Sequence, residues 1–399
     1  MWENEIDIRE IREIRVKTTA FLGVGAIRKM DSIAGQLAKR GICKVIAVTG
    51  KGAYKKTGAW DCVLKALAAH NIDHVLYDKV TPNPEVLHVD EATLMGRKFG
   101  AQAVIAIGGG SPIDAGKAVA VLLKYPERNA TEFCELVFPI EEAVPLVAIN
   151  LTHGTGTEVD RFAVVSIPEK DFKPAIAAEC MYPLFAIDDP ALMTGLAPDQ
   201  TTFVTVDALN HVVEACSTKV ATPFSILLAQ EVVRLIAKYL PLVQKNPEDL
   251  EARYYLTYAA LIAGTSFDNG LLHMTHALEH PLSGLKPETT HGQGLALLLP
   301  SIIRHIYHAK KETLFHVLRP LLGELDFARA SADDVAGAVK KWLAGVGIEE
   351  TLKDLGFGEE HLDDLTRLAF ETPGLKGLLQ LAPVDVGPDV VRAIYEESL

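Results

Sequence analysis

Histidines are concentrated in one stretch of the chain, and a nearby aspartate has the spacing to join them in a metal site. Five of the 13 histidines fall within residues 211–291. Asp207 and His211 are four residues apart, so both project from one face of a helix. A carboxylate and imidazoles from separate elements are suitable ligands for Fe²⁺ or Zn²⁺. The spacing therefore predicts metal binding in this stretch.

The other histidines of the stretch leave the choice of ligands open. His273, His276 and His280 have the spacing to share a face of a second helix, which Pro281 should end or kink. His291 stands at the expected start of a third helix. A single helical histidine is usually a surface or core residue, but several in a segment rich in Leu, Ala and Val would be costly to bury without a partner. Spacing alone does not decide which of the three histidines on the second helix is a ligand.

A glycine-rich turn at 108–111 has the features of a phosphate-binding loop. It follows the apolar run AVIAI and opens a helix through Pro112, which suits a first helical turn. Glycines let the backbone approach a phosphate, and the N-terminus of a helix favours an anion. A tight turn capped by Ser111 would account for the same residues. In an alternating α/β sequence, the pattern favours phosphate binding.

Two further glycine-containing segments are weaker signals. Gly23-Val24-Gly25 lacks the third glycine of a dinucleotide fingerprint and follows no apolar strand, so we expect a surface turn there. The segment THGTGTE at 152–158 follows the apolar run PLVAINL. Its hydroxyls and glycine amides could bond pyrophosphate or ribose, but turn formation explains the same residue types equally well.

The elements that would position these groups differ between the two halves of the chain. Before residue 190, short apolar runs alternate first with helical patterns and then with loops, which indicates βαβ units and a parallel sheet. After Pro190, apolar residues recur at helical spacing with no convincing strand. We predict an α/β nucleotide-binding domain over 1–189 and an all-helical metal-binding domain over 190–399. The expected strands are 44–50, 73–78, 103–110, 145–151, 162–167 and 183–189.

Composition excludes several classes of protein. The 399 residues carry a net charge of −13, which disfavours nucleic acid and anionic membrane surfaces as partners. No apolar run reaches the roughly 18–20 residues of a membrane helix, and the charged N-terminus does not resemble a signal sequence. The five cysteines are scattered without a CxxC pair, which predicts reduced thiols and a cytoplasmic location.

Taken together, five blocks of sequence resemble the iron-containing (group III) alcohol dehydrogenase family. In chain order they are GGGSPIDAGKA, THGTGTEVD, DALNHVVEA, HMTHALEHPLSG and TTHGQGLALLLP. The resemblance implies a dehydroquinate synthase-like architecture with bound Fe²⁺, or Zn²⁺ in its place. It also implies a nicotinamide cofactor and a homo-oligomer, in the simplest case a dimer.

The same resemblance implies roles for individual residues. HALEHPLSG resembles the family's HxxxHxxG block with one residue more before the glycine, and the first histidine of that block is a ligand, so the implied metal ligands are Asp207, His211, His276 and His291. His280 then lies beside substrate and nicotinamide as a catalytic residue that positions groups or relays a proton. Phe267 falls where the family lines its substrate pocket. The implied cofactor contacts are Asn83, Gly109, Gly110, Ser111, Asp114, Thr152, Thr155 and Lys173.

The residue after KVIAVT sets the expected cofactor preference. An acidic residue near the adenosine end bonds the ribose 2′-hydroxyl and repels a 2′-phosphate. Members of the resembled family that use NAD often carry Asp at this position, whereas this chain has Gly50, followed by Lys51 and, nearby, Lys55 and Lys56. We therefore expect NADP(H) to be preferred over NAD(H), with lysines available to the phosphate. A plain turn glycine and solvated lysines are the alternative, under which NAD(H) also serves.

The sequence thus predicts a metal-dependent alcohol dehydrogenase or aldehyde reductase. A metal would act as Lewis acid on the oxygen of a small alcohol or aldehyde, and hydride would pass to or from NAD(P). A glycerol-dehydrogenase-like polyol oxidoreductase and a dehydroquinate-synthase-like lyase are the alternatives within this architecture. The four-ligand set argues against both, because those relatives generally use fewer of these ligands. A scaffold protein would not need buried histidines and aspartate.

Overall fold

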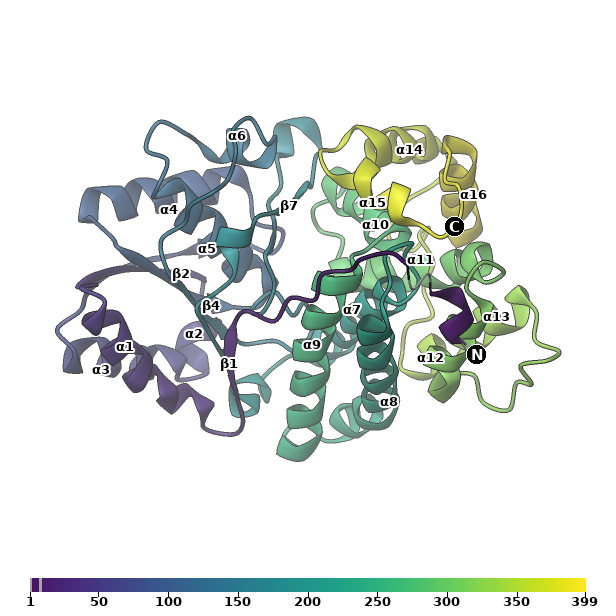
Figure 1. Cartoon of the computed structure of the whole chain (residues 1–399), viewed down its shortest axis with the longest axis horizontal. Helices are drawn as coiled ribbons and strands as arrows, with labels where there is room; N and C mark the ends of the chain where they lie inside the picture. Colours follow the sequence, from purple (N-terminus) through teal and green to yellow (C-terminus); the bar gives the residue numbers. More distant parts are fainter. Residues whose placement is uncertain (1, 7–8) are drawn as a thin grey trace.

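The computed structural model describes residues 2–6 and 9–399, and it has two halves that differ in secondary structure. A sheet with flanking helices forms one half and helices alone form most of the other (Figure 1). The predicted order, an α/β part followed by a helical part, is confirmed. Among the described residues, no helix is both long and apolar enough to cross a lipid bilayer.

Six parallel strands form the main sheet, in the order β1–β8–β5–β4–β2–β3. The central strands β4 and β5 are buried along their whole length, as expected for a parallel sheet covered on both faces. Five of the predicted strands belong to this sheet. In the order just given, the bounds are Thr19–Leu22, Phe185–Asp188, Leu146–Asn150, Ala103–Gly108, Lys44–Gly50 and Asp73–Val80.

Helices cover each face of the sheet because successive strand residues point to opposite sides. Ile46 of β2 packs into the core formed with α4 (Val86–Phe99) and α5 (Gly110–Leu122). Its neighbour Val45 packs into the core formed with α1 (Met30–Lys39) and α3 (Ala59–Ala69). The near-continuous apolar strand sequences are thus accounted for by burial on two sides.

Two sequence predictions about strands are wrong. The run at 162–167 does not join the main sheet: β6 (Phe162–Val164) pairs antiparallel with β7 (Ala175–Ala177) in a small separate sheet. Gly23 does follow a strand, because β1 ends at Leu22. This edge strand has four partly exposed residues, too few to produce a periodic signal. The turn after it is anchored by the Asp189 carboxylate, which accepts a hydrogen bond from the backbone N–H of Gly25 at 3.0 Å.

The helical half has one hydrophobic core. Pro281 lies inside α10 and does not end it, since the helix continues to Leu285; of the two effects expected of this proline, the kink stays a prediction. The helices that carry the predicted site residues of this half are α7 (Pro198–Ala215), α9 (Leu250–Gly270), α10 (Met274–Leu285) and α11 (His291–Ile306). The remaining α-helices of this half are α8, α12, α13, α14, α15 and α16, at Pro223–Lys245, Lys311–Leu318, Ala332–Gly345, Leu362–Glu371, Leu375–Leu381 and Pro388–Ser398.

The N-terminal segment contacts the helical half before it enters the sheet. It runs from the helical half to β1 (Figure 1), and the backbone N–H of Arg15 donates to Asn269 Oδ1 of α9 at 2.6 Å. Trp2 and Ile6 pack against the core of the helical half. The division of the chain into domains at residue 190 stays a prediction.

The loop after β5 joins the two halves by packing directly on helices. His153 is buried, and its Nε2 accepts a hydrogen bond from Arg253 Nη1 of α9 at 2.7 Å. Gly156 has a left-handed φ of 67° and lies against Gly264 of α9. A Cβ added to Gly264 would lie 2.4 Å from the Gly156 carbonyl oxygen, so only glycine fits at this contact.

We expect Gly264→Ala to destabilise the protein by about 1–3 kcal/mol, because the loop backbone must move to admit the new methyl group. Gly337→Ala is the matched control: it lies inside α13 with no atom within 4 Å of an added Cβ. That change should instead stabilise by up to about 1 kcal/mol through helix propensity. Urea unfolding measures the free energy of unfolding of both variants. Equal changes in Gly264→Ala and Gly337→Ala would contradict the tight contact at Gly264.

Candidate active site between the sheet and the helices

A cavity of about 760 Å³ lies between the two halves of the chain. Gly50 and Gly108, at the carboxyl ends of β2 and β4, line it from the sheet. Asp207 of α7 and His276 of α10 line it from the helices. The strand order reverses between β2 and β4, since β3 lies on one side of β2 and β4 on the other. Ligands of open parallel sheets bind at such a switch point, outside the carboxyl ends of the strands.

The two small-residue loops meet and form one wall of this cavity. A Cβ on Gly109 would lie 2.8 Å from Thr152 Cγ2, and one on Gly110 would lie 2.7 Å from Thr155 Cγ2. Together with Ser111, these residues line the cavity at the N-terminus of the 13-residue helix α5. The structure therefore brings the predicted phosphate-binding residues together, at a position whose backbone dipoles favour an anion.

Three other predicted cofactor contacts line the cavity but already bond protein groups. Asp114 accepts hydrogen bonds from Thr157 Oγ1 at 2.6 Å and from the backbone N–H of Val164, and burial raises its pKa. Asn83 Nδ2 donates to the carbonyl of Pro287 at 3.0 Å. Lys173 lies beside the histidine cluster, where its Nζ donates to Ser283 Oγ at 2.8 Å. Their roles toward a nucleotide stay predictions.

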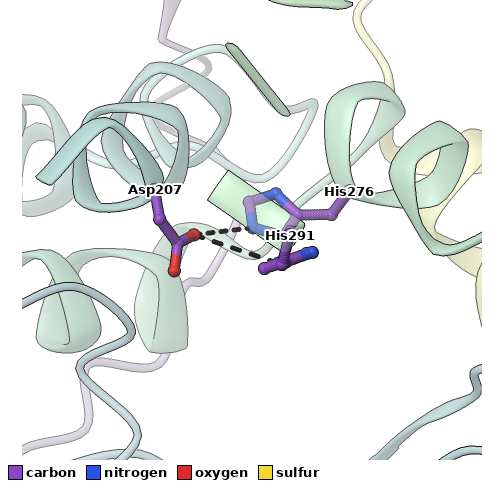
Figure 2. Close-up of side chains that lie close together, drawn as sticks. All are labelled: Asp207, His276 and His291. Carbon is purple, nitrogen blue, oxygen red and sulfur yellow. Dashed lines mark ion pairs between the residues drawn. The ribbon is translucent and has the colours of Figure 1, made fainter. Parts of the chain in front are cut away.

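Asp207 and three histidines converge at the helical end of the cavity. Oδ1 of Asp207 lies 3.5 Å from His211 Nε2, 3.6 Å from His276 Nε2 and 4.0 Å from His291 Nε2. Figure 2 shows Asp207, His276 and His291 directed toward one another from three helices. Ligands at 2.0–2.2 Å from a tetrahedral metal lie about 3.4 Å apart, so these spacings suit one ion.

The hydrogen bonding of the cluster also fits a cation. Asp207 Oδ1 and His276 Nε2 are buried, and neither has a hydrogen-bond partner within the described parts of the chain. Burial alone would raise the pKa of Asp207, but the imidazoles of His211, His276 and His291 lower it below its usual range, so the carboxylate is ionised. Buried polar atoms without partners are unfavourable, and a divalent ion would satisfy them together.

Glu214, which sequence reasoning missed, orients His276. Its carboxylate contacts His276 Nδ1 and accepts the backbone N–H groups of His273 at 2.9 Å and Thr275 at 2.8 Å. Burial would raise the pKa of Glu214, but His276 and His273 lower it to about 2. A metal-binding histidine commonly donates its second nitrogen to such a carboxylate. Glu214 is seven residues from Asp207, two helical turns on the same face, and this spacing could have identified it.

His211 is oriented by ring packing. Its ring stacks against Phe267 at 4.5 Å and against His276 at 4.6 Å between centroids. Phe267 in turn contacts Phe162 of β6 at 5.6 Å. The predicted pocket residue Phe267 therefore lies next to a candidate ligand, in an apolar part of the cavity wall. Further apolar lining residues are Val164, Ala175, Leu272 and Leu378.

His273 does not share a face with His276 and His280, and this prediction is wrong. His273 precedes α10, which begins at Met274, so the helical period does not apply to it. It is fully buried, and its Nε2 lies 2.9 Å from Ser217 Oγ, away from Asp207. His276 alone of the three histidines reaches the cluster around Asp207.

His280 lines the cavity beside the cluster with one nitrogen available. Its Nδ1 donates to the carbonyl of Lys173 at 2.7 Å, which leaves Nε2 as an acceptor. Burial holds the pKa of His280 well below its usual value, so the ring is neutral. A neutral imidazole with a free acceptor nitrogen can take a hydrogen bond or a proton from a bound hydroxyl.

Comparisons with known proteins find the same family in both halves of the chain. Residues 17–190 match the family model for iron-containing alcohol dehydrogenase, and residues 201–399 match the C-terminal model of the Fe-containing alcohol dehydrogenase family. A long-chain primary alcohol dehydrogenase of Thermoanaerobacter ethanolicus is 54% identical over 398 residues, covering 100% of each chain.

Solved structures of alcohol dehydrogenases are similar over nearly the same length. An archaeal halo-thermophilic alcohol dehydrogenase from a Red Sea brine pool superposes with a TM-score of 0.92 at 28% identity, over 98% of this chain and 100% of that one. The NADH-dependent butanol dehydrogenase A of Thermotoga maritima superposes with a TM-score of 0.88 at 29% identity, over 98% of each chain.

We expect His276→Ala or His291→Ala to abolish retention of a divalent ion, because each removes a nitrogen directed at Asp207. His273→Ala should retain the ion, since that ring faces Ser217. Metal content per chain after gel filtration, measured by elemental analysis, checks the difference. Full occupancy in His276→Ala together with loss in His273→Ala would show that the wrong histidine has been assigned.

Proposed function

This chain belongs to the iron-containing alcohol dehydrogenase family, and we propose that it interconverts long-chain primary alcohols and their aldehydes with NADP(H) and a divalent metal, Fe²⁺ in the native enzyme. One observation carries the proposal: the glycine-rich helix N-terminus and the Asp–His cluster line the same cavity. A dehydrogenase that uses both a dinucleotide and a metal needs these two sites within reach of one substrate.

The cavity offers each bound group a distinct set of residues. Gly109, Gly110 and Ser111, with Thr152 and Thr155, would hold the pyrophosphate of the dinucleotide. The candidate cluster for the metal is Asp207, His211, His276 and His291. When bound, the metal supplies Lewis-acid stabilisation of the substrate oxygen, and the nicotinamide supplies or accepts hydride.

The chain's own residues would orient the alcohol. His280 presents Nε2 to the cavity as a hydrogen-bond acceptor, so it would position the substrate hydroxyl or take its proton. Phe267 and Phe162 contact each other and would exclude water from this part of the site. The apolar wall suits an aliphatic chain, and the 54% identical relative is named for long-chain primary alcohols.

We expect kcat/KM on the Fe²⁺-loaded enzyme to rise with the length of a linear primary alcohol. Each methylene buried against the apolar wall contributes ~0.8 kcal/mol, or up to about fourfold. The measurement is a series from ethanol to 1-decanol, with glycerol as the polyol control. A preference for glycerol, or no dependence on chain length, would contradict the proposed substrate class.

The preference for NADP(H) rests on the end of β2. Gly50 and Lys51 line the cavity there, whereas Lys55 and Lys56, in the short helix α2 (Ala53–Lys56), do not. Of the three lysines named from the sequence, Lys51 is therefore the one placed to meet a 2′-phosphate. Gly50 brings no carboxylate to repel that phosphate.

Gly50→Asp should shift the ratio of kcat/KM for NADPH over NADH toward NADH by tenfold or more, because a carboxylate repels the 2′-phosphate. An added Cβ at Gly50 lies 3.1 Å from the Val80 carbonyl, so the backbone must give slightly to admit it. Gly52→Asp is the matched control, since Gly52 does not line the cavity. A wild-type enzyme that prefers NADH tenfold would refute the proposed preference, as would an unchanged ratio in Gly50→Asp.

A further inference from the structure

We propose that Glu279 is a positioning residue that fixes the ring of His291 so that His291 Nε2 faces Asp207. This inference rests on the metal site of the proposed function. Glu279 occupies a position that the HxxxHxxG block leaves unspecified. In the structure, its carboxylate contacts His291 Nδ1, the ring nitrogen other than the one that faces Asp207.

His291 is the candidate ligand that packing restrains least. Its side chain is 25% exposed, compared with 4% for Asp207, 7% for His211 and 4% for His276. His291 is also the first residue of α11, so no preceding turn of that helix covers it. A ring in this setting needs a specific partner to hold one orientation.

Glu279 supplies that partner from the neighbouring helix α10. Its Oε2 contacts His291 Nδ1, so Nδ1–H donates to the carboxylate and Nε2 is the nitrogen left for the cluster. Its Oε1 accepts a hydrogen bond from Ser283 Oγ at 2.6 Å. Both carboxylate oxygens therefore have partners, and the side chain is fully buried.

Lys173 balances the buried charge. Its Nζ lies 3.3 Å from Glu279 Oε2 and 2.8 Å from Ser283 Oγ, and the lysine is itself 4% exposed. A buried carboxylate is tolerated when it is both paired and hydrogen-bonded, and Glu279 meets both conditions. The position of the Lys173 ammonium is thus explained by Glu279 without a nucleotide.

A glycine in α11 leaves the space that this carboxylate requires. Gly294 is three residues after His291, and an added Cβ would lie 3.0 Å from Glu279 Cγ. His276 is held in the same way as His291, because its Nδ1 contacts the carboxylate of Glu214. The two histidines contributed by α10 and α11 to the cluster are therefore each held by a buried carboxylate through Nδ1.

The alternative is an ion held by Glu279 instead of Asp207. Ligand atoms of Glu279, His280 and His291 also lie within 4.8 Å of one another. In that arrangement Glu279 would bind the ion itself, and Asp207 would be dispensable. The Lys173 ammonium beside Glu279 opposes a cation at that point by charge repulsion.

The test is the affinity of the full-length metal-free protein for Zn²⁺, measured by competition with a chromophoric chelator. Glu279→Ala should weaken binding 10–100-fold, as removal of such a histidine partner does elsewhere. Glu279→Gln should recover part of the loss, because an amide oxygen still accepts from Nδ1–H. Gly294→Ala, which crowds Glu279 without changing charge, should also weaken binding and serves if Glu279→Ala fails to fold.

Ser283→Ala is the matched control, since it removes the hydrogen bonds of this hydroxyl to the same carboxylate and to Lys173 but does not touch His291. Its affinity should stay within about threefold of wild type. Thermal unfolding of the metal-free variants separates loss of affinity from loss of fold, because a positioning role predicts lower affinity in a variant that is still folded at the temperature of the assay.

Three results would overturn the inference, and they differ from one another. Affinities of Glu279→Ala and Glu279→Gln within twofold of wild type would show that Glu279 does not position His291. A loss in Glu279→Ala with no loss in Asp207→Ala would place the ion at Glu279 instead. A wild-type chain without Zn²⁺ affinity would remove the metal site of the proposed function, and this inference with it.

Discussion

The burial of ionised and polar side chains inside a helical core is the constraint on which the rest of this structure depends. Asp207, Asn210, His211 and Glu214 are all buried on α7, a helix covered on nearly every side. Moving such groups out of water without partners costs roughly 2–7 kcal/mol for each polar group and more for each charge. The fold meets this cost by placing carboxylates beside imidazoles and backbone N–H donors.

Those compensating contacts also determine which helices must touch. Glu214 of α7 accepts hydrogen bonds from the backbone N–H of Thr275 in the first turn of α10, where such groups have no partner inside their own helix, and from that of His273 just before the helix. Glu279 of α10 contacts the first residue of α11. The helices are therefore joined at the site by the groups that hold its histidines, and Asp207 Oδ1 and His276 Nε2 remain directed at a shared point.

The sheet side of the same cavity favours a group of the opposite charge to the one that the helical side favours. The N-terminus of α5 favours an anion, whereas the cluster around Asp207 favours a cation. A reaction between a dinucleotide and a substrate held by a metal requires these sites to keep a fixed separation, because reacting atoms must approach to about 3–3.5 Å. The packing of Gly156 on Gly264 and of His153 on Arg253 fixes the loop that links the two halves.

The sequence by itself determined the features that depend on local pattern. Apolar runs located the strands of the main sheet except β1, the glycine turn marked the start of α5, and the four-residue spacing of Asp207 and His211 placed them on one face. Tertiary structure decided what depends on residues far apart in the chain. Edge strand β1 is too short to show a period, and β6 pairs with β7 in a separate sheet although its sequence resembles that of the main-sheet strands. His273 leaves the cluster because α10 begins one residue later, and Glu214 and Glu279 acquire roles only when α10 packs beside α7 and α11. Periodicity records which side of an element is buried, but the partner of a buried side chain is set by the packing of separate elements.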